Sequence, residues 1–305
     1  MVLKCSRDLK TDLLGKIMTE DSLCSKCGTC AIACPHGVLV QKDKNAVPVT
    51  YWGSECISCG HCVAICPNGA IIHEDYMKNR IKLIDRSIYP SSDQVLCLLN
   101  SRRSIRAFQD KKVEKKLVEL LISGAKSAPS SSNSQNIEYV VVQDPAILGK
   151  IVRILADFYG KLVYLLKNPE ILDNLPEIAK NRPLDAKPLL STFERIVNRI
   201  KAQNDILQCG TPTLLVAHAP NKPFDWPLVN ASIALQNISL LCGSLGLGSC
   251  QLGYIETIMD KDPKIQELLD IPDSHAVYGV LALGYPDYTF DNWIEKKQPK
   301  ITWKL

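Results

Sequence analysis

The sequence predicts an α+β protein made of two domains, a small cysteine-rich domain and a larger one that mixes helices and strands. A chain of 305 residues exceeds one core of average size. Nine of the 13 cysteines lie before residue 70, whereas the later part shows helical and strand periodicities without regular β-α-β alternation. The polar, turn-rich segment 84–94 is the expected linker, and we therefore place the domains at residues 1–86 and 87–305.

Composition and charge exclude several classes of function. The first 16 residues carry scattered charges and no apolar run before a cleavage site, so we expect no signal peptide and a cytoplasmic protein. The apolar stretch 228–250 contains Asn230, Gln236 and Asn237 and is typical of a buried helix, not of a membrane span. No helix face or terminal arm concentrates lysine and arginine, so the net charge of +4 does not predict nucleic-acid binding.

One cysteine pattern occurs twice in the first domain. The segments "CSKCGTCAIACP" (24–35) and "CISCGHCVAICP" (56–67) both read C-x2-C-x2-C-x3-C-P. Three thiolates on a tight loop can bind three irons of a [4Fe–4S] cluster. We expect the fourth cysteine of each segment to begin a helix and to be a ligand of the other cluster. This predicts one cluster on Cys24, Cys27, Cys30 and Cys66, and another on Cys56, Cys59, Cys62 and Cys34.

Zinc is the alternative occupant of these cassettes. Zinc modules usually present two separated C-x2-C pairs, often with histidine, whereas this chain has two full sets of four cysteines. His36 and His61 lie within or beside the cassettes, but the predicted clusters need no further ligand. The stretch from about residue 20 to 75 resembles the bacterial-type two-cluster ferredoxins, which implies one-electron transfer through two [4Fe–4S] clusters.

The second domain is expected to begin with a helix over residues 113–128, with Asp110 as its N-cap, and to continue with alternating element types. The later elements are predicted as a strand at 137–143, a helix at 145–166, a helix at 191–207, a strand at 212–219, a long apolar helix at 228–245 and a strand at 276–286.

Four stretches of this domain carry polar or glycine-rich patterns. They are "SRRSIRAF" (101–108), "APSSSNSQN" (128–136), "NASIALQNISLLCGSLGLGSCQLGYI" (230–255) and the basic tail "KKQPKITW" (296–303). In the first, Arg102, Ser104 and Arg106 alternate, so an extended segment directs all three to one side, where they suit a phosphate and a ribityl chain. Taken singly, the first two stretches are better explained as a solvated basic patch and a polar loop.

Together with "GVLALGYP" (279–286), these stretches resemble the nitroreductase family of FMN enzymes over residues 95–305. The resemblance implies a homodimer with FMN at the interface, bound by residues of both chains. It also implies the flavin-binding positions Arg102, Arg103, Ser104, Arg106, Pro129, Ser130, Ser131, Asn133, Leu252, Gly253 and Tyr254, with Lys297 or Lys300 on the phosphate. A Rossmann site is the alternative for Gly243, Gly246 and Gly248, but these glycines follow a helix where that fingerprint requires a strand.

The function predicted from these two modules is electron transfer from the two clusters to FMN, which reduces a small electrophile such as a nitroaromatic or a quinone in an anaerobe. The external donor would be a ferredoxin or NAD(P)H. One alternative is an NAD(P)H-driven FMN reductase with the clusters as a side path. Another is an electron-transfer or redox-sensing protein without a small substrate of its own.

No side chain is predicted to be catalytic, because the flavin carries the chemistry. Cys250 is expected to be a small buried residue, although it could contact substrate. Tyr254 could donate a proton, whereas His218 is expected to be structural. In the family, helices inserted near residues 160–208 cover the flavin. Within this excursion the residues that could favour an anionic or aromatic substrate are Lys180, Arg182, Lys187, Phe193 and Arg195, although a solvated helical face better explains most of them. The cysteines expected in core or surface positions are Cys5, Cys97, Cys209 and Cys242.

Overall fold

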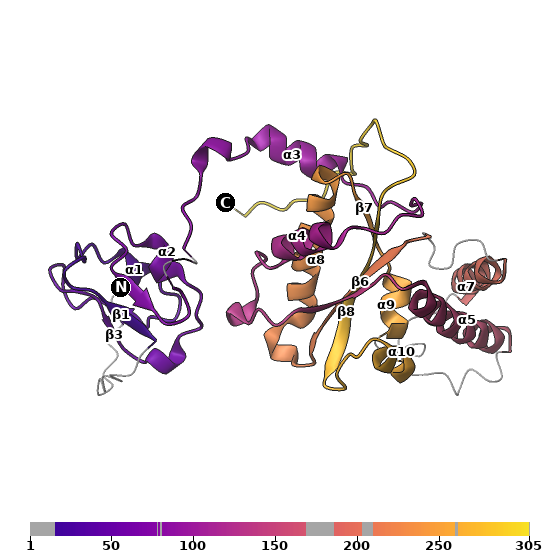
Figure 1. Ribbon diagram of the computed structural model, residues 1–305, viewed down its shortest axis with the longest axis horizontal. Helices are drawn as coiled ribbons and strands as arrows, with labels where there is room; N and C mark the ends of the chain where they lie inside the picture. Colours follow the sequence, from indigo (N-terminus) through magenta and orange to yellow (C-terminus); the bar gives the residue numbers. More distant parts are fainter. Residues whose placement is uncertain are drawn as a thin grey trace. The chain divides into compact units, whose positions relative to one another are not determined.

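The computed structural model describes residues 16–77, 79, 81–168, 186–202, 210–259 and 262–304. The chain divides into two compact units, Met1–Tyr89 with Ser132–Ser134, and Pro90–Ser131 with Gln135–Leu305 (Figure 1). The predictions made for Cys5, Cys209, Lys180 and Arg182 lie outside the described residues, as does the side chain of Lys187.

The first unit is built from two short sheets and two short helices. Strand β1 (Ile17–Thr19) pairs antiparallel with β4 (Ile71–His73), and β2 (Leu39–Val40) pairs with β3 (Val49–Thr50). The helices are α1 (Thr29–Ala33) and α2 (His61–Ile65). The core is small and includes cysteines: its buried members are Ile17, Cys30, Val38, Leu39, Cys62, Val63 and Ile71.

The fourth cysteine of each cassette ends a helix, so the prediction that it begins one was wrong. Cys34 is the C-cap of α1, and Cys66 is the C-cap of α2; both have extended backbone angles. A proline follows each of these cysteines, and the residue before a proline is disfavoured in the helical region. The turn of helix therefore lies between the third and the fourth cysteine.

The second unit is an α+β fold, as predicted, and its described strands form one antiparallel sheet. The strand order is β5 (Glu138–Val142), β6 (Thr213–Pro220), β8 (His275–Gly284) and β7 (Gly248–Gln251). One face packs against α4 (Lys115–Ala125) and α8 (Pro227–Ser244). The other packs against α5 (Pro145–Lys167), α7 (Ala186–Lys201), α9 (Gly253–Met259) and α10 (Pro263–Leu268), and α3 (Ser92–Ser101) precedes the domain core (Figure 1).

Because helices cover both faces, the central strand β6 is apolar on both sides. Leu214 and Val216 lie in the core on the α5 side, whereas Leu215 and Ala217 lie in the core on the α8 side. This burial explains the continuous apolar run in the sequence, which differs from the alternation of a strand with one wet face.

Helix α4 begins at Lys115 with Glu114 as N-cap, so Asp110 is not the cap. Val113 is buried before the helix starts, and its carbonyl accepts a hydrogen bond from Gln143 Nε2 at 2.8 Å. Those contacts keep the chain extended for longer than the apolar spacing suggests.

Within the predicted excursion, Phe193 of α7 packs against the ring of Tyr159 on α5, with 5.2 Å between the centroids. This contact and its place beside the core make Phe193 a packing residue, whereas Arg195 is exposed. In the described parts of the chain, no helix combines the length and apolarity needed to cross a membrane.

Candidate functional site

The two cysteine loops repeat each other in hydrogen bonding as well as in sequence. Gly28 and Gly60 both adopt φ 72°, a left-handed conformation that glycine reaches without strain, and each precedes a helix. Backbone N–H groups donate to four cysteine sulfurs at matching positions: Lys26 to Cys24 and Ser58 to Cys56 at 3.4 Å, Val38 to Cys34 and Ala70 to Cys66 at 3.2 Å. Such donors stabilise thiolates and the reduced form of a cluster.

The structure brings the fourth cysteine of each cassette to the other cassette. One cavity is lined by Cys34 together with Cys56, Cys59 and Cys62. Burial, with a smaller contribution from the negative charges of these three neighbours, raises the pKa of Cys62 to about 11. Burial also raises the pKa of Cys30, and the neighbouring charges that add to the effect are those of Cys66 and Cys24. Four thiols around one cavity are a donor set that fits a [4Fe–4S] cluster.

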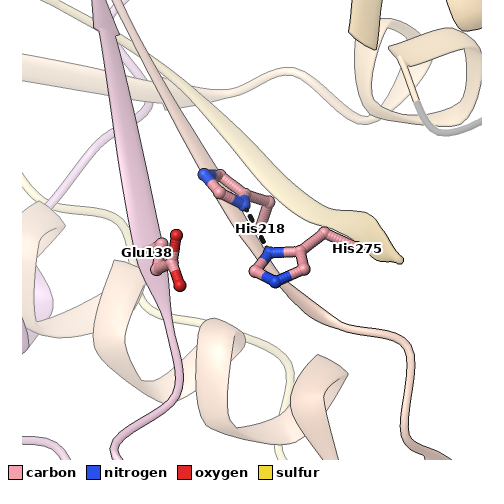
Figure 2. A group of neighbouring side chains, drawn as sticks. All are labelled: Glu138, His218 and His275. Atoms are coloured by element: carbon pink, nitrogen blue, oxygen red, sulfur yellow. Dashed lines mark hydrogen bonds between the residues drawn. The ribbon is translucent and has the colours of Figure 1, made fainter. Parts of the chain in front are cut away.

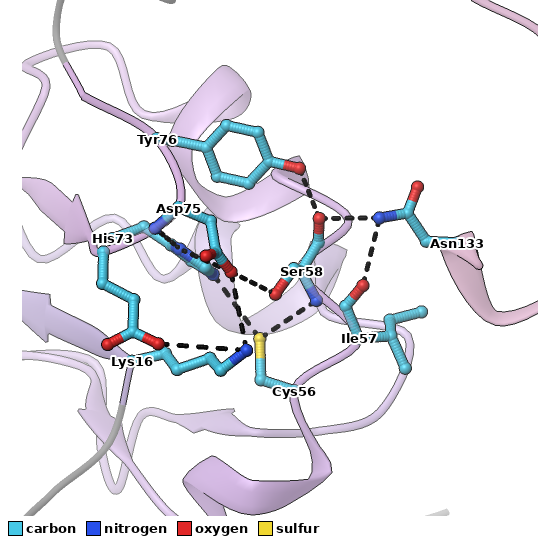
Figure 3. A network of polar contacts seen from close by, with 9 residues as sticks. Lys16, Cys56, Ile57, Ser58, His73, Asp75, Tyr76 and Asn133 are labelled. Atoms are coloured by element: carbon cyan, nitrogen blue, oxygen red, sulfur yellow. Dashed lines mark hydrogen bonds and ion pairs between the residues drawn. The ribbon is translucent and has the colours of Figure 1, made fainter. Parts of the chain in front are cut away.

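His73 distinguishes the second loop from the first. Its Nε2 lies 3.5 Å from Cys56 Sγ, while the backbone N–H of Asp75 donates to its Nδ1 at 3.1 Å (Figure 3). Because Nδ1 accepts, the proton of the neutral ring is on Nε2, which donates to the sulfur. Burial lowers the pKa of His73 and so favours this neutral form.

His73 is not among the residues predicted from the sequence, although the repeat contains a signal for it. Gln41 stands at the matching position of the first half, and its Nε2 donates to the carbonyl of Lys26 at 2.8 Å, not to a sulfur. A comparison of the two halves therefore points to the residue that makes the loops chemically different.

Asn133 contacts the second cysteine loop. It belongs to the segment 132–134 that clusters with the first unit, and its Nδ2 donates to the carbonyls of Ser58 at 2.7 Å and Ile57 at 3.1 Å (Figure 3). The resemblance to the nitroreductase family implies that Asn133 binds the flavin, whereas in the structure its Nδ2 donates to these two backbone carbonyls of the loop. The Ser58 carbonyl also accepts from the hydroxyl of Tyr76.

In the second unit, the predicted phosphate-binding segment runs beside strand β7. Ser104 forms a parallel bridge with Ser249, and the Ile105 N–H donates to the Ser249 carbonyl at 3.0 Å. The side chain of Ile105 is buried, whereas Arg106 is exposed. Arg102 and Ser104 are half-buried. Because both lie an even number of residues before Arg106, an extended segment places all three on the side opposite Ile105. The predicted alternation of Arg102, Ser104 and Arg106 therefore matches the local backbone.

The C-terminal residues contact this segment at two points. Arg106 N–H donates to the hydroxyl of Tyr288 at 3.1 Å, and the Arg103 guanidinium lies 5.3 Å from the ring centroid of Phe290. Lys297 and Lys300 are exposed in the irregular tail that follows.

The second predicted flavin stretch is held by a buried asparagine. Asn230 of α8 is 3% exposed; its Oδ1 accepts from the Ser131 N–H at 3.0 Å, and its Nδ2 donates to the Asp225 carbonyl at 2.8 Å. Ser130 Oγ accepts from the Gln135 N–H at 3.0 Å, and Pro129 is exposed. A polar residue in an otherwise apolar helix is the sequence signal for this position.

The third stretch opens helix α9. Leu252 is buried and its N–H donates to the Val280 carbonyl at 2.9 Å, so Gly253 and Tyr254 form the first turn. The Tyr254 side chain is 46% exposed, and its carbonyl accepts from the Tyr159 hydroxyl at 2.8 Å. The first N–H groups of a helix have no partner within it and can meet an acceptor outside. Cys250 is buried in the core on β7, as expected for a small apolar side chain.

The family of the chain follows from a comparison with known families. The model of the nitroreductase family matches residues 99–285, which is more than half of the chain. The chain belongs to the nitroreductase family. A second match, to the 4Fe-4S dicluster domain, covers residues 23–71 and includes both cassettes.

Individual relatives match this nitroreductase over similar lengths. A protein of Archaeoglobus fulgidus, whose name includes NAD(P)H nitroreductase, is 26% identical over 194 residues, covering 64% of this chain and 86% of that protein. An FMN reductase (NADPH) of Bacillus subtilis is 26% identical over 186 residues, covering 61% of this chain and 63% of its own length.

Solved structures share the fold of the second unit. A nitroreductase from Bacteroides fragilis with bound FMN has a TM-score of 0.50 at 21% identity and covers 69% of this chain and 98% of its own. A nitroreductase from Desulfitobacterium hafniense with bound FMN has a TM-score of 0.51 at 20% identity, covering 68% and 96%. At these identities the likeness establishes the fold.

Proposed function

We propose that this nitroreductase is an oxidoreductase that takes electrons through two [4Fe–4S] clusters and uses FMN to reduce a small electrophile, such as a nitroaromatic or a quinone. The observation that carries the proposal is the presence in one chain of the dicluster cassettes and the nitroreductase domain. When bound, the clusters would carry electrons singly and FMN would deliver them in pairs. Reduction of a nitro group to a nitroso group consumes two electrons and two protons and releases water.

The cluster ligands in this proposal are the eight cassette cysteines, with the fourth cysteines exchanged. The cavity shared by Cys34 and the second cassette supports this assignment, as does the proximity of Cys66 to Cys30. The amide donors to sulfur would favour the reduced state.

The FMN site is proposed to lie on the backbone segments that surround β7. Arg102, Ser104 and Arg106 share one side of their segment and would receive the phosphate and the ribityl chain. The turn at Gly253 would present backbone N–H groups to the ring. The remaining proposed contacts are Arg103, Pro129, Ser130, Ser131, Leu252 and Tyr254, with Lys297 or Lys300 on the phosphate.

We further propose a homodimer with FMN at its interface, because large apolar side chains are exposed on α3, on α8 and along the tail. They are Val95, Leu96, Leu98 and Leu99; Leu228, Val229 and Ile233; and Trp293, Ile294, Ile301 and Trp303. Exposed apolar surface of this extent is typical of an interface. Sedimentation should find a dimer, and deletion of residues 291–305 should weaken it; a monomeric FMN-loaded protein would contradict the proposal.

The test of the proposed activity uses the full chain purified without oxygen. Iron, sulfide and FMN are quantified, the protein is reduced with a reduced ferredoxin or with dithionite, and a nitroaromatic or quinone is added. We expect enough iron and sulfide for two [4Fe–4S] clusters per FMN. We also expect the added acceptor to re-oxidise the flavin and to be converted to its reduced product. Absence of flavin, or reduced flavin that reacts with none of these acceptors, would overturn the proposal.

A second candidate donor, NAD(P)H acting directly on the flavin, is favoured by the name of the Bacillus subtilis relative, an FMN reductase (NADPH). Cys27→Ser separates the two routes, with Cys97→Ser as the matched control because both thiols are exposed. If electrons enter through the clusters, Cys27→Ser loses ferredoxin-driven turnover and Cys97→Ser keeps it. If NADPH reduces the flavin directly, NADPH-driven turnover survives in both variants.

A further inference from the structure

Three metal-ligating side chains meet at one end of the sheet in the second unit. Glu138, His218 and His275 come from the neighbouring strands β5, β6 and β8 and point toward one another (Figure 2). Each offers one ligand atom, and these atoms all lie within 4.8 Å of one another. The two imidazole Nδ1 atoms are 2.9 Å apart.

A register shift in the sheet creates this cluster. Glu138 stands directly opposite His218 in the pairing of β5 with β6. The pairing of β6 with β8 shifts after Ala217, which makes Val277 the partner of His218. His275, two residues before Val277, therefore lies on the same face as His218. Without the shift, His275 would project from the opposite face.

The three side chains differ in burial in a way that suits a site open to solvent on one side. His218 is 4% exposed and continues the face of β6 that carries Leu214 and Val216. His275 is half-buried and Glu138 is exposed. The buried imidazole is held in place by its surroundings, and the two less buried ligands leave a path by which an ion can enter from solvent.

We propose that Glu138, His218 and His275 bind a single divalent transition-metal ion of the zinc class, at a site separate from the cluster cysteines. Two imidazole nitrogens and one carboxylate oxygen are a zinc donor set that leaves a fourth position for water. Ligand atoms about 2.0–2.1 Å from a tetrahedral ion are about 3.3 Å apart, so the imidazoles need to separate by only a few tenths of an ångström. The ion would connect three strands at the end of the sheet.

The hydrogen-bonded pair of imidazoles without an ion is the competing state, and zinc bound by the cassettes is the competing location. The test therefore uses the full chain, purified without oxygen and loaded with clusters, and dialysed against chelator-buffered zinc. Zinc, iron and sulfide are measured together, and X-ray absorption at the zinc edge identifies the ligand atoms, because Zn–S bonds of about 2.3 Å differ from Zn–N bonds of about 2.0–2.1 Å.

We expect one zinc ion per chain with nitrogen and oxygen ligands and an unchanged iron content. Glu138→Gln and His275→Asn should each lower zinc affinity at least tenfold and abolish the rise in thermal midpoint on zinc addition. Glu267→Gln, at an exposed glutamate of α10, is the matched control and should bind zinc normally. Zinc that is absent, sulfur-ligated, bound at the expense of iron, or retained equally by Glu138→Gln would overturn the proposal.

Discussion

His73 makes the two cysteine loops unequal through one side chain. The loops share their glycine conformations and their amide donors to sulfur, but Cys56 has the imidazole of His73 at 3.5 Å as a further partner. At the matching position Gln41 donates to a backbone carbonyl. A donor to a thiolate favours the reduced cluster, so we expect the cluster held by Cys56 to have its potential raised by this contact.

Replacement of the imidazole tests this expectation. His73→Phe should lower the potential of one cluster by about 40 mV, if the hydrogen bond contributes about 1 kcal/mol to a one-electron couple. A redox titration followed by electron paramagnetic resonance measures both clusters. His36→Phe, at an exposed histidine that lines the same cavity, controls for the loss of an imidazole near the cluster. Equal shifts of both clusters in His73→Phe, or no shift, would contradict the role assigned to His73.

Asn230 connects α8 to the loop that carries Ser131. Asn230→Ala removes the acceptor of the Ser131 N–H and the donor to the Asp225 carbonyl. Loss of buried partners should lower the free energy of unfolding by about 1–3 kcal/mol and weaken FMN binding. Urea unfolding and flavin fluorescence measure the two effects. Asn237→Ala, which loses one longer bond of 3.3 Å to Gly124, should leave FMN affinity unchanged, and an equal loss in both variants would argue against a specific role for Asn230.

At the scale of elements, the arrangement of the 102–106 segment beside β7 depends on a glycine. A Cβ added to Gly248 would lie 2.6 Å from Ile105 Cγ1, closer than two carbon atoms can approach. Gly248 is therefore needed for the close packing that directs Arg106 and Ser104 away from the core.

Gly248→Ala tests this close approach. Overpacking should lower the free energy of unfolding by about 1–3 kcal/mol and reduce FMN affinity, because the segment must move. Gly243→Ala is the control, since a Cβ there meets nothing within 4 Å, and its stability should be unchanged or slightly higher. Thermal unfolding and flavin titration measure both variants; normal FMN affinity in Gly248→Ala would show that the segment does not position the flavin.

At the scale of the whole molecule, the two units depend on different sources of stability. Among its described residues, the first has a core of seven buried members, two of which are the cluster cysteines Cys30 and Cys62. The second has a sheet with a hydrophobic core on each face. We therefore expect cluster binding to be coupled to folding in the first unit and not in the second.

Removal of the clusters by oxidation and chelation should unfold the first unit alone. Hydrogen exchange followed by mass spectrometry should show loss of protection in β1, β4 and the two short helices, with β6 and β8 still protected. Removal of FMN is the complementary control and should leave the first unit protected. Loss of protection in β6 after cluster removal would contradict independent folding of the units.

The sequence determined the α+β class of the chain and most of the elements that build it, because cassette spacing and apolar periodicity are local. The predicted helix at 145–166 and strand at 212–219 appear as Pro145–Lys167 and Thr213–Pro220. The predicted helix boundaries differ from the structure at two places. The burial of Val113 goes with a start of α4 at Lys115, later than predicted. Cys34 and Cys66, each followed by a proline, lie at the ends of helices.

Only the tertiary structure decided which distant residues meet. His73 of β4 reaches Cys56 across 17 residues of chain, and Asn230 reaches Ser131 across 99 residues. The cluster of Glu138, His218 and His275 depends on a one-residue register shift between β6 and β8. Sequence periodicity indicates which residues share a face of one strand. The register between strands is set by packing on both faces of the sheet, and no local pattern encodes that packing.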